Sequence, residues 1–550
     1  MARKLISPRL ALDRRTFLGT GALAAAGLAV GATPFGAWAQ DRRLTTVGGT
    51  AKTRAGKVRG LLKDGVHQFW CVPYGAPTGG VNRFMPPKQP APWSGVKDHF
   101  EITYAAPIAP GAQEPAPVVT ALNRHTPQSE DCLSVNVFTP GLDDKARPVM
   151  VWMHGGGFSV GSGNYLLYDG TNLAKKEDVV VVAVNHRLNI FGFLHLADLG
   201  GEKWAESTNV GIQDLRATLE WVRDNIENFG GDPDRVMIFG QSGGGGKTTT
   251  VMAMPSAKGL FHRAVAQSGS AFRGQTASAA TEGAERFIAK LGIKKNQLDK
   301  LHELTTKQIQ DAYYSDPAIP GLGTGPVIDG HILPRNQWDP TAPAYSANVP
   351  LIAGSVETEN GWVGPPPYDL SDADMLDRFE KRLANDDPAQ GRTLLALYQR
   401  LHPKTRNQML WLMAEADDTR RWNAQALCRL KQEQGTAASY LYFFDWYSPV
   451  HNNRMGSYHT LDIPFVFYNM DLGASMTGSA QERYKLGHIM SAAWAAFART
   501  GNPDHADMPH WPSFDAARYP TMVFDDNVRV VDDPNKEERL ALAELRKKRT

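Results

Sequence analysis

Two stretches of the chain match Gly-x-Ser-x-Gly, a pattern in which a serine on a tight turn can serve as a nucleophile. Residues 240–244 surround Ser242, and residues 157–161 surround Ser159. Glycines two positions before and after the serine allow a sharp strand-to-helix turn that exposes its hydroxyl. Ser242 follows the apolar segment 235–239, whereas Ser159 lies in a glycine-rich loop. The context therefore predicts Ser242 as the nucleophile and a structural role for Ser159.

A glycine-rich segment offers the electrophilic half of the same chemistry. Residues 154–158 read His-Gly-Gly-Gly-Phe and directly follow an apolar segment. Acyl transfer to a serine places negative charge on the carbonyl oxygen of the substrate, and backbone N–H groups aimed at that oxygen stabilise it. We expect Gly156 and Gly157 to be two of these donors and Gly243, the residue after the nucleophile, to be the third.

Apolar strands and helical patterns alternate around these residues. Short apolar runs that predict buried strands occupy residues 149–153, 179–185, 236–239, 264–267, 350–353 and 440–444. Residues 209–227 have helical spacing, with Leu215, Leu219, Val222 and Ile226 on one face. This alternation predicts an α/β fold with a mainly parallel central sheet that is covered by helices on both faces.

Two helical regions stand apart from that alternation. The stretch from about residue 360 to 435 separates two predicted strands by far more than a usual crossover. We interpret it as a helical insertion over the active site. Residues 536–549 are charged and helical, which predicts a solvated surface helix.

Composition and charge exclude several classes of function. The formal net charge of the 550 residues is +2, which gives no basic field for nucleic acid. A phosphate-binding loop at residues 243–247 fails because Gln241 stands where the motif needs a glycine. Cys71, Cys132 and Cys428 are far apart and have no ligand spacing, so a metal site is not expected. Their odd number leaves at least one thiol free or paired between chains, and the sequence leaves the oligomeric state open.

The first 39 residues have the features of an export signal. Residues 13–19 resemble a twin-arginine motif, residues 21–31 are mildly apolar, and Ala37-Trp38-Ala39 fits a cleavage site. The apolar run is too short and too rich in glycine for a stable membrane anchor. We therefore expect a signal peptide at residues 1–39, cleavage near Ala39, a catalytic domain at residues 40–550, and a periplasmic or secreted mature protein.

Several further segments resemble the type-B carboxylesterase family, which has the α/β-hydrolase fold and includes para-nitrobenzyl esterases and cholinesterases. The matching segments are residues 69–77, 83–87, 92–96, 129–133, 185–193 and 229–233, and they follow one another in family order. The resemblance extends from about residue 50 to 525. It implies a serine hydrolase that cleaves carboxylic esters of small molecules through an acyl-enzyme, with no metal or organic cofactor.

The resemblance also implies the two partners of the serine. The family's acid lies just after a sheet strand, in a segment similar to residues 354–359, which places it on Glu359 with Glu357 as the alternative. The family's base precedes a run similar to residues 463–467, which places it on His459. The order Ser, Glu, His is the order of α/β hydrolases. We expect His459 to accept the serine proton and Glu359 to orient the imidazole.

The chain departs from the family at several positions. Gln241, Gly243 and Thr460 stand where an acidic residue, Ala and Gly are usual, and Cys132 lacks its usual upstream partner, so we expect an unpaired thiol there. Leu122 stands where cholinesterases carry Trp, which argues against choline esters.

The substrate is not fixed by these residues. Amide, carbamate or lactone cleavage on the same triad stays an alternative, whereas a non-catalytic binding module would require a missing Ser or His. Candidate pocket aromatics, for each of which core packing is favoured, are Phe158, Trp362, Tyr368, Trp411 and Trp446.

Overall fold

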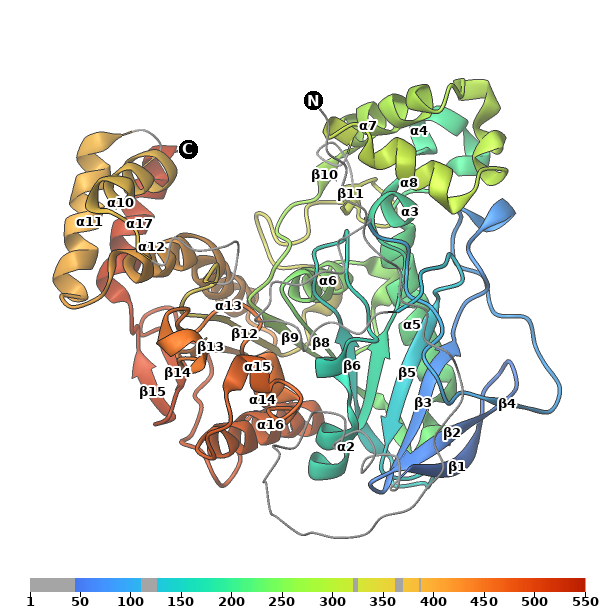
Figure 1. The fold of residues 1–550 in the computed structure, drawn as a ribbon, viewed down its shortest axis with the longest axis horizontal. Coiled ribbons are helices and arrows are strands. Elements are labelled where there is room, and N and C mark those ends of the chain that lie inside the picture. The colour runs from blue at the N-terminus through green and yellow to red at the C-terminus, as the bar shows by residue number, and fades with distance from the viewer. Residues whose placement is uncertain (1–44, 110–125, 320–324, 362–368, 385–386, 550) are drawn as a thin grey trace, which may run out of the picture. The chain divides into compact units, whose positions relative to one another are not determined.

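One large twisted sheet organises the part of the chain that the computed structural model describes, residues 45–549 without 110–125, 320–324, 362–368 and 385–386 (Figure 1). Along the sheet the strands are β1 (Thr45–Lys52), β2 (Lys57–Lys63), β3 (Val66–Pro73), β5 (Ser134–Thr139), β7 (Val180–Val184), β6 (Arg147–Met153), β8 (Gly231–Gln241), β9 (Arg263–Gln267), β12 (Leu351–Val356), β13 (Ser439–Phe444), β14 (Pro520–Phe524) and β15 (Arg529–Asp532). The short strand β4 (Val96–Asp98) pairs with β2.

The middle of the sheet is parallel and its ends are antiparallel. Every neighbouring pair from β7 to β14 is parallel. The pairs β1·β2, β2·β3, β3·β5, β5·β7 and β14·β15 are antiparallel. The strands β6, β7, β12 and β13 are buried along their whole length, as expected for strands covered on both faces. The predicted mainly parallel sheet and its six apolar strand segments are confirmed.

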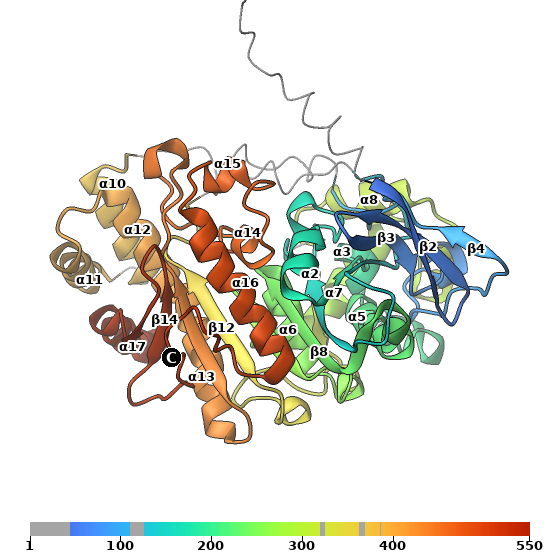
Figure 2. The same cartoon turned by 90° about the horizontal axis from the view of Figure 1, so that it is seen from below.

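Helices cover both faces because alternate side chains of each strand point to opposite sides. On one face, Val149 and Val151 of β6 share a core with α5 (Val210–Asn225), α6 (Gly243–Met252) and α13 (Trp422–Gln434). On the other face, Met150 and Trp152 share a core with α2 (Thr171–Glu177), α14 (Ile463–Val466) and α16 (Arg483–Thr500). Figure 2 shows α16 and α2 lying across that second face.

The helix predicted over residues 209–227 is α5, and it continues as a 3-10 turn, η6 (Ile226–Phe229). The four residues predicted to share one face, Leu215, Leu219, Val222 and Ile226, are all fully buried. Besides α5 and α6, the α-helices between residues 189 and 314 are short or lie away from the central sheet. They are α3 (Asn189–Phe193), α4 (Ala197–Gly200), α7 (Ala277–Lys290) and α8 (Thr306–Tyr314). Of these, α7 contacts the small sheet of β10 (Gln275–Thr276) and β11 (Val327–Ile328), and α8 contacts α7.

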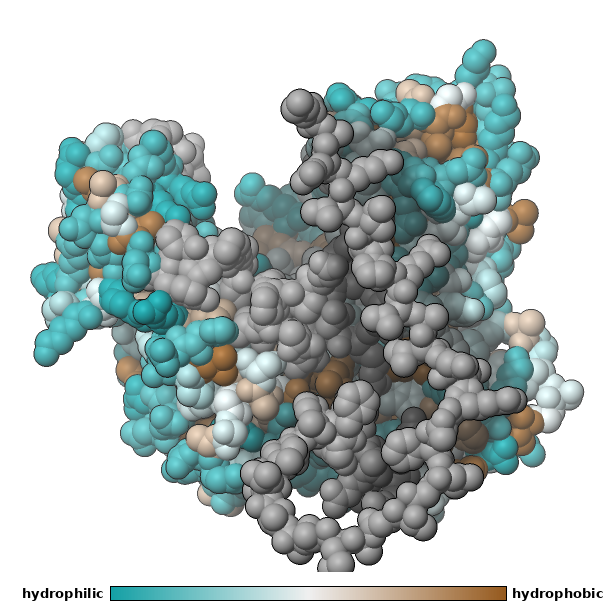
Figure 3. All heavy atoms as spheres, in the orientation of Figure 1, coloured by the Kyte–Doolittle hydropathy of each residue, from teal (hydrophilic) through white to brown (hydrophobic). Residues whose placement is uncertain are grey.

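The long segment between β12 and β13 is helical where the structure describes it. It forms α10 (Asp372–Arg378), α11 (Pro388–Leu401), α12 (Asn407–Ala416) and α13, joined in places by π-helical turns. The first three of these helices have their own apolar cluster, which includes Trp411. In the view of Figure 3, the surface over α10 and α11 is mostly hydrophilic, because the apolar side chains of this cluster point inward.

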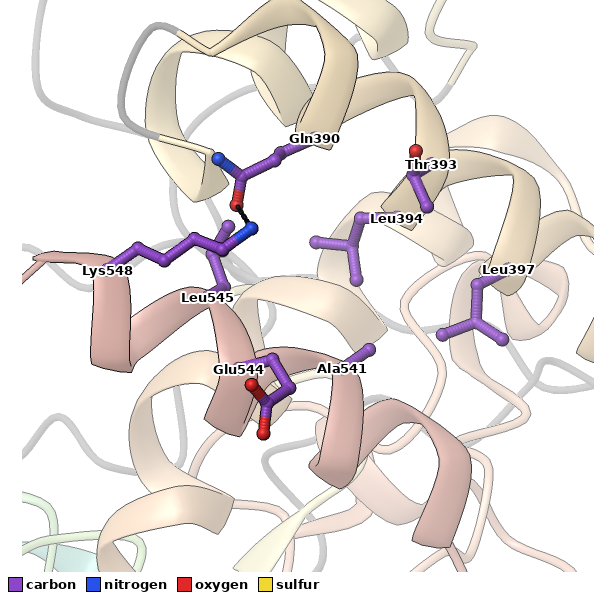
Figure 4. Close-up of a pocket in the computed structure, with 8 residues that line it drawn as sticks. All are labelled: Gln390, Thr393, Leu394, Leu397, Ala541, Glu544, Leu545 and Lys548. Carbon is purple, nitrogen blue, oxygen red and sulfur yellow. Dashed lines mark hydrogen bonds between the residues drawn. The ribbon is translucent and has the colours of Figure 1, made fainter.

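The C-terminal helix α17 (Lys536–Arg549) differs from the solvated helix that its charge predicts. Leu542 and Leu545 are buried in the same cluster as α10 to α12, and α17 packs along α11. A pocket of about 390 Å³ opens between α11 and α17, with Leu394, Leu397 and Ala541 among its apolar residues (Figure 4). An apolar stripe at helical spacing, hidden among charged residues, anchors this helix to the insertion. α15 (Ala474–Thr477) completes the helices near the C-terminal strands.

Candidate active site

Ser242 occupies the turn between strand β8 and helix α6, near the centre of the sheet (Figure 1). Its backbone has φ +60° and ψ −124°, a conformation that L-residues rarely adopt and that marks functional turns. Its N–H donates to the Gln267 carbonyl at 2.8 Å. Because Ser242 precedes the first turn of α6, the helix dipole favours negative charge on its side chain.

The two glycines of the motif are required by close backbone contacts. A Cβ added to Gly240 would lie 2.4 Å from the Met153 carbonyl oxygen, and one added to Gly244 would lie 1.9 Å from the same oxygen. Both distances are far below van der Waals contact. The end of β6 and the Ser242 turn therefore fit together only with glycine at both positions.

The three predicted oxyanion donors lie together beside Ser242. Gly156 and Gly157 have φ +90° and +62° in the loop after β6, which an L-residue would adopt only under strain. A Cβ added to Gly155 would lie 3.5 Å from the Cβ of Ser242, so this loop borders the serine. A Cβ added to Gly243 would lie 2.3–2.4 Å from Gly157 backbone atoms. Ser159, in contrast, lies in the turn of this loop, where its N–H donates to the Gly156 carbonyl.

His459 and Glu359 are brought together where the segment after β12 runs beside the segment before α14. Thr358 pairs with Tyr458 as an isolated bridge, and the His459 N–H donates to the Glu359 carbonyl at 3.3 Å. The side chains hydrogen-bond through His459 Nδ1 and Glu359 Oε2, and both are almost fully buried. The carboxylate also accepts the Val356 N–H at 3.2 Å. A carboxylate at Nδ1 places the proton there, so that Nε2 is the nitrogen able to accept a proton.

The alternative acid, Glu357, has different neighbours. It is buried beside Asp445 and Tyr447, and burial together with the Asp445 charge raises its pKa to about 8. The Arg421 guanidinium opposes that shift. The structure therefore brings Glu359, and not Glu357, to His459.

Two residues at which the chain departs from the family are neighbours of His459, Gln241 through space and Thr460 along the chain. The amide nitrogen of the buried Gln241 is 3.2 Å from each ring nitrogen of His459. Thr460, which directly follows the histidine, has φ +77° and a buried hydroxyl. Glycine is the residue that adopts this conformation without strain.

A further carboxylate under the site was not predicted from the sequence. Asp462 is fully buried and accepts hydrogen bonds from Gln267 Nε2 at 2.8 Å and from the Tyr442 hydroxyl at 2.9 Å. Burial raises its pKa, and the two hydrogen bonds oppose that rise. Its place three residues after His459, in the segment that identified the base, is the signal that the sequence offered.

The predicted pocket aromatics divide into three groups. Trp411 is part of the cluster of the insertion, and Trp446 packs on Phe465 with ring centroids 5.0 Å apart. Phe158 is half-buried and packs edge-on against Phe193. Trp362 and Tyr368 lie outside the described residues, and so does Leu122, the position at which cholinesterases carry Trp. Core packing therefore accounts for Trp411 and Trp446, and Phe158 is the aromatic placed directly on the glycine loop.

All three cysteines are buried free thiols. Burial raises the pKa of Cys428 to about 12 and the pKa of Cys132 further still, so neither forms a thiolate readily. Within the described ranges, no three His, Cys, Asp or Glu side chains gather as metal ligands. Over the same residues, no helix has the length and apolar character needed to cross a bilayer.

Comparison with known proteins places this geometry in a family. A model of the carboxylesterase family matches residues 48–543. The sequence is 35% identical over 501 residues to the para-nitrobenzyl esterase of Bacillus subtilis (strain 168), and the match covers 89% of this chain and 97% of that protein. It is 30% identical over 482 residues to the phenmedipham hydrolase of Pseudarthrobacter oxydans, with 85% and 93% covered.

Solved structures agree with the sequence matches. A carboxylesterase of Geobacillus stearothermophilus superposes with a TM-score of 0.77 at 33% identity, covering 90% of this chain and 99% of that one. An esterase from Clostridium hathewayi that can hydrolyse aliphatic aromatic polyesters superposes with a TM-score of 0.77 at 32% identity, covering 91% and 100%. The chain therefore belongs to the carboxylesterase family, has the α/β-hydrolase fold and is a serine-dependent carboxylic ester hydrolase.

Proposed function

We propose that Ser242, His459 and Glu359 form the catalytic triad and that Gly156, Gly157 and Gly243 bind the oxyanion. The observation that supports this most strongly is the hydrogen bond between His459 and Glu359, with the histidine ring against the residue that precedes Ser242. No other serine of a Gly-x-Ser-x-Gly pattern shares that setting, because Ser159 lies within the loop turn.

The reaction proceeds in two steps on these residues. His459 Nε2 accepts the Ser242 proton as Oγ attacks the ester carbonyl, and the carbonyl electron pair moves onto oxygen. The glycine N–H groups stabilise that oxygen, and His459 then donates the proton to the departing alcohol. Water deprotonated by His459 cleaves the acyl-enzyme and releases the acid. Throughout, the Glu359 carboxylate holds the Nδ1 proton and stabilises the imidazolium.

The substrate class that this site supports best is a medium-sized, uncharged or aromatic ester, and the half-buried Phe158 on the glycine loop favours an apolar acyl or alcohol group. Amide, carbamate or lactone cleavage stays an alternative on the same triad. Phenmedipham, the compound for which one relative is named, is the first compound with which to test that alternative.

The test is hydrolysis of p-nitrophenyl esters over a series of acyl chain lengths by wild type, Ser242→Ala and Ser159→Ala. Ser242→Ala should lose about 10⁴- to 10⁶-fold in kcat, as removal of a triad nucleophile does in other serine hydrolases. Ser159→Ala is the matched control and should keep kcat within about threefold. Full activity in Ser242→Ala, or loss in Ser159→Ala alone, would contradict the assignment.

We also propose export of the protein after cleavage near Ala39. The support is the twin-arginine-like segment at residues 13–19, the apolar run that follows it and the cleavage sequence at residues 37–39. N-terminal sequencing of the protein from periplasmic and cytosolic fractions tests it, beside a variant with Arg14→Lys and Arg15→Lys. An intact N-terminus on cytosolic wild-type protein would contradict export.

A further inference from the structure

A buried lysine on the nucleophile helix contacts the glycine loop. Lys247 follows Ser242 by five residues in α6 and is fully buried. Its ammonium donates to the His154 carbonyl at 2.8 Å, the carbonyl immediately before the three glycines. In the described part of the chain, no carboxylate pairs with it. Burial lowers the pKa of Lys247 to about 7, so the protein bears a cost to keep an ammonium there.

The peptide group between Gly155 and Gly156 is oriented by the side chain of His154, the residue whose carbonyl accepts the hydrogen bond from Lys247. His154 Nδ1 lies 2.8 Å from the Gly155 carbonyl oxygen, which can only accept, so the ring donates to it. Burial and the Lys247 charge both hold the pKa of His154 well below its usual value, which keeps the ring neutral. In a trans peptide the N–H points opposite to the C=O. Fixing the Gly155 carbonyl therefore fixes the direction of the Gly156 N–H.

The same argument applies to the following peptide. The Gly156 carbonyl accepts the N–H groups of Ser159 at 3.3 Å and Val160 at 3.0 Å. The Gly157 N–H therefore points the other way, because the one cis peptide among the described residues is Asp339–Pro340. Three successive carbonyls of the loop, from His154 to Gly156, thus have donors, and the donors to the Gly155 and Gly156 carbonyls determine where the N–H groups of Gly156 and Gly157 point.

The loop also lies unusually close to α6. A Cβ on Gly243 would be 2.3 Å from Gly157 N and 2.4 Å from Gly157 Cα. An Ala, usual for the family at this position, would therefore collide with the loop as it stands here. Two features of α6 thus favour its close approach to the glycine loop: the hydrogen bond from Lys247 to the His154 carbonyl, and the absence of a Cβ at Gly243.

We propose that Lys247 is a positioning residue that holds the glycine loop against α6 in the geometry that binds the oxyanion. This inference rests on the proposed roles of Ser242 and of the glycines. Lys247 does not touch substrate. It acts through the His154 carbonyl and, one peptide further, through the hydrogen bond from the His154 ring to the Gly155 carbonyl.

The test compares Lys247→Met with Lys431→Met in the full-length protein. Lys431 is a matched control, because it too is buried, on α13, and its ammonium donates to the Ala347 carbonyl at 2.9 Å. Active sites are counted by titration with a p-nitrophenyl phosphonate, so that misfolded protein does not lower kcat. The readouts are kcat and KM for the best p-nitrophenyl ester and Ki for a trifluoromethyl ketone, whose adduct with serine carries an oxyanion.

Lys247→Met should lower kcat per active site by about 10- to 100-fold, somewhat less than the loss of a whole oxyanion donor. KM should change less than about twofold, and Ki should rise in parallel with the fall in kcat/KM. Lys431→Met should leave all three values within about twofold. An unchanged kcat in Lys247→Met, or a rise in KM that alone accounts for the loss, would overturn the inference.

A second variant addresses the loop from the other side. Gly243→Ala must displace Gly157 and should give the same pattern, a lower kcat and a higher Ki at nearly constant KM. If Lys247→Met does not fold, wild-type kcat and Ki in Gly243→Ala would overturn the inference on their own. Ser242→Ala is included throughout, because activity that survives in Ser242→Ala contradicts the triad itself, whereas activity lost there but kept in Lys247→Met contradicts only the positioning role.

Discussion

Replacing Glu359 and Glu357 by Gln, one at a time, tests which of two neighbouring carboxylates assists His459. Gln keeps the volume of Glu and removes only its charge. At residue 359 the change replaces the carboxylate that hydrogen-bonds His459 Nδ1. The amide can present its NH₂ group to Nδ1 and so favour the tautomer in which Nε2 carries the proton, and that tautomer cannot accept a proton from Ser242.

The expected magnitudes differ by orders of magnitude. An equivalent change in a serine protease triad lowers kcat by about 10⁴-fold, and we expect about 10³- to 10⁴-fold for Glu359→Gln. Glu357 has a pKa raised to about 8 by burial and by Asp445. Burial and the neighbouring Asp445 carboxylate both favour the protonated, neutral form of Glu357. Glu357→Gln therefore imitates the state already present and should keep kcat within about twofold at pH 7.

The assay is steady-state hydrolysis of one p-nitrophenyl ester at pH 7, with active sites titrated in wild type and in both variants. KM should stay within about threefold, because neither carboxylate contacts the scissile group. Greater loss in Glu357→Gln than in Glu359→Gln would refute the assignment of the acid. Equal small losses in both would refute the idea that a charged partner orients His459.

Three further perturbations test the folded framework by urea unfolding. Because the pKa of Glu357 is higher in the folded than in the unfolded state, the folded protein retains a proton that the unfolded chain releases, so the free energy of unfolding of wild type relative to Glu357→Gln should fall as pH rises from about 4.5 to about 8. The comparison with the variant removes the effect of buried histidines such as His154 and His186, whose lowered pKa values act in the opposite direction, and a difference that rises with pH would contradict the burial argument. Thr460→Gly should raise the free energy of unfolding by about 1 kcal/mol, because glycine adopts φ +77° without the backbone strain that threonine has there. A lower urea midpoint for the variant would mean that the Thr460 side chain stabilises the fold by more than its backbone strain costs. Asp214→Ala should lower the free energy of unfolding by about 3–5 kcal/mol, because it leaves the buried Arg187 guanidinium without its carboxylate. Asp532→Ala removes one partner of an exposed ion pair and should lower it by less than about 1 kcal/mol. Equal losses in the two variants would show that burial does not decide the difference.

Six strands of the parallel centre could be predicted because their buried residues form short apolar runs, whereas β14, which is also parallel and buried, was not predicted. The antiparallel edge is different. β1 has a single buried residue and two adjacent glycines, and β2 is only partly buried, so neither strand has a long apolar run. β1 pairs with β2, and β2 pairs with β3 across the two-residue turn Asp64-Gly65, so hairpin pairing and not a buried apolar run holds these edge strands.

The packing of the C-terminal helix α17 also could not be predicted from its own sequence, which is dominated by charged residues. Its charged residues predict solvation, yet Leu542 and Leu545 are buried against α11, about 150 residues earlier in the chain. Two leucines three residues apart are too few to distinguish a packed helix from a solvated one. The partner surface, and not the helix itself, decides which of the two forms.

Some residues of the proposed site are recognisable from their own residue type, whereas others gain a role only through a distant contact. Gly240 and Gly244 are recognisable because the carbonyl of Met153 forbids any side chain at either position, so the constraint is written in the residue type. The sequence around Lys247 gives no comparable signal, because a lysine in a helix is ordinarily exposed to solvent. Only its contact with the His154 carbonyl, 93 residues away, gives it a role. Gly243 and Lys247 each look neutral when taken alone, but together they allow and stabilise one close approach of the glycine loop to α6. A pairwise requirement of this kind becomes visible only when both partners have been placed in space.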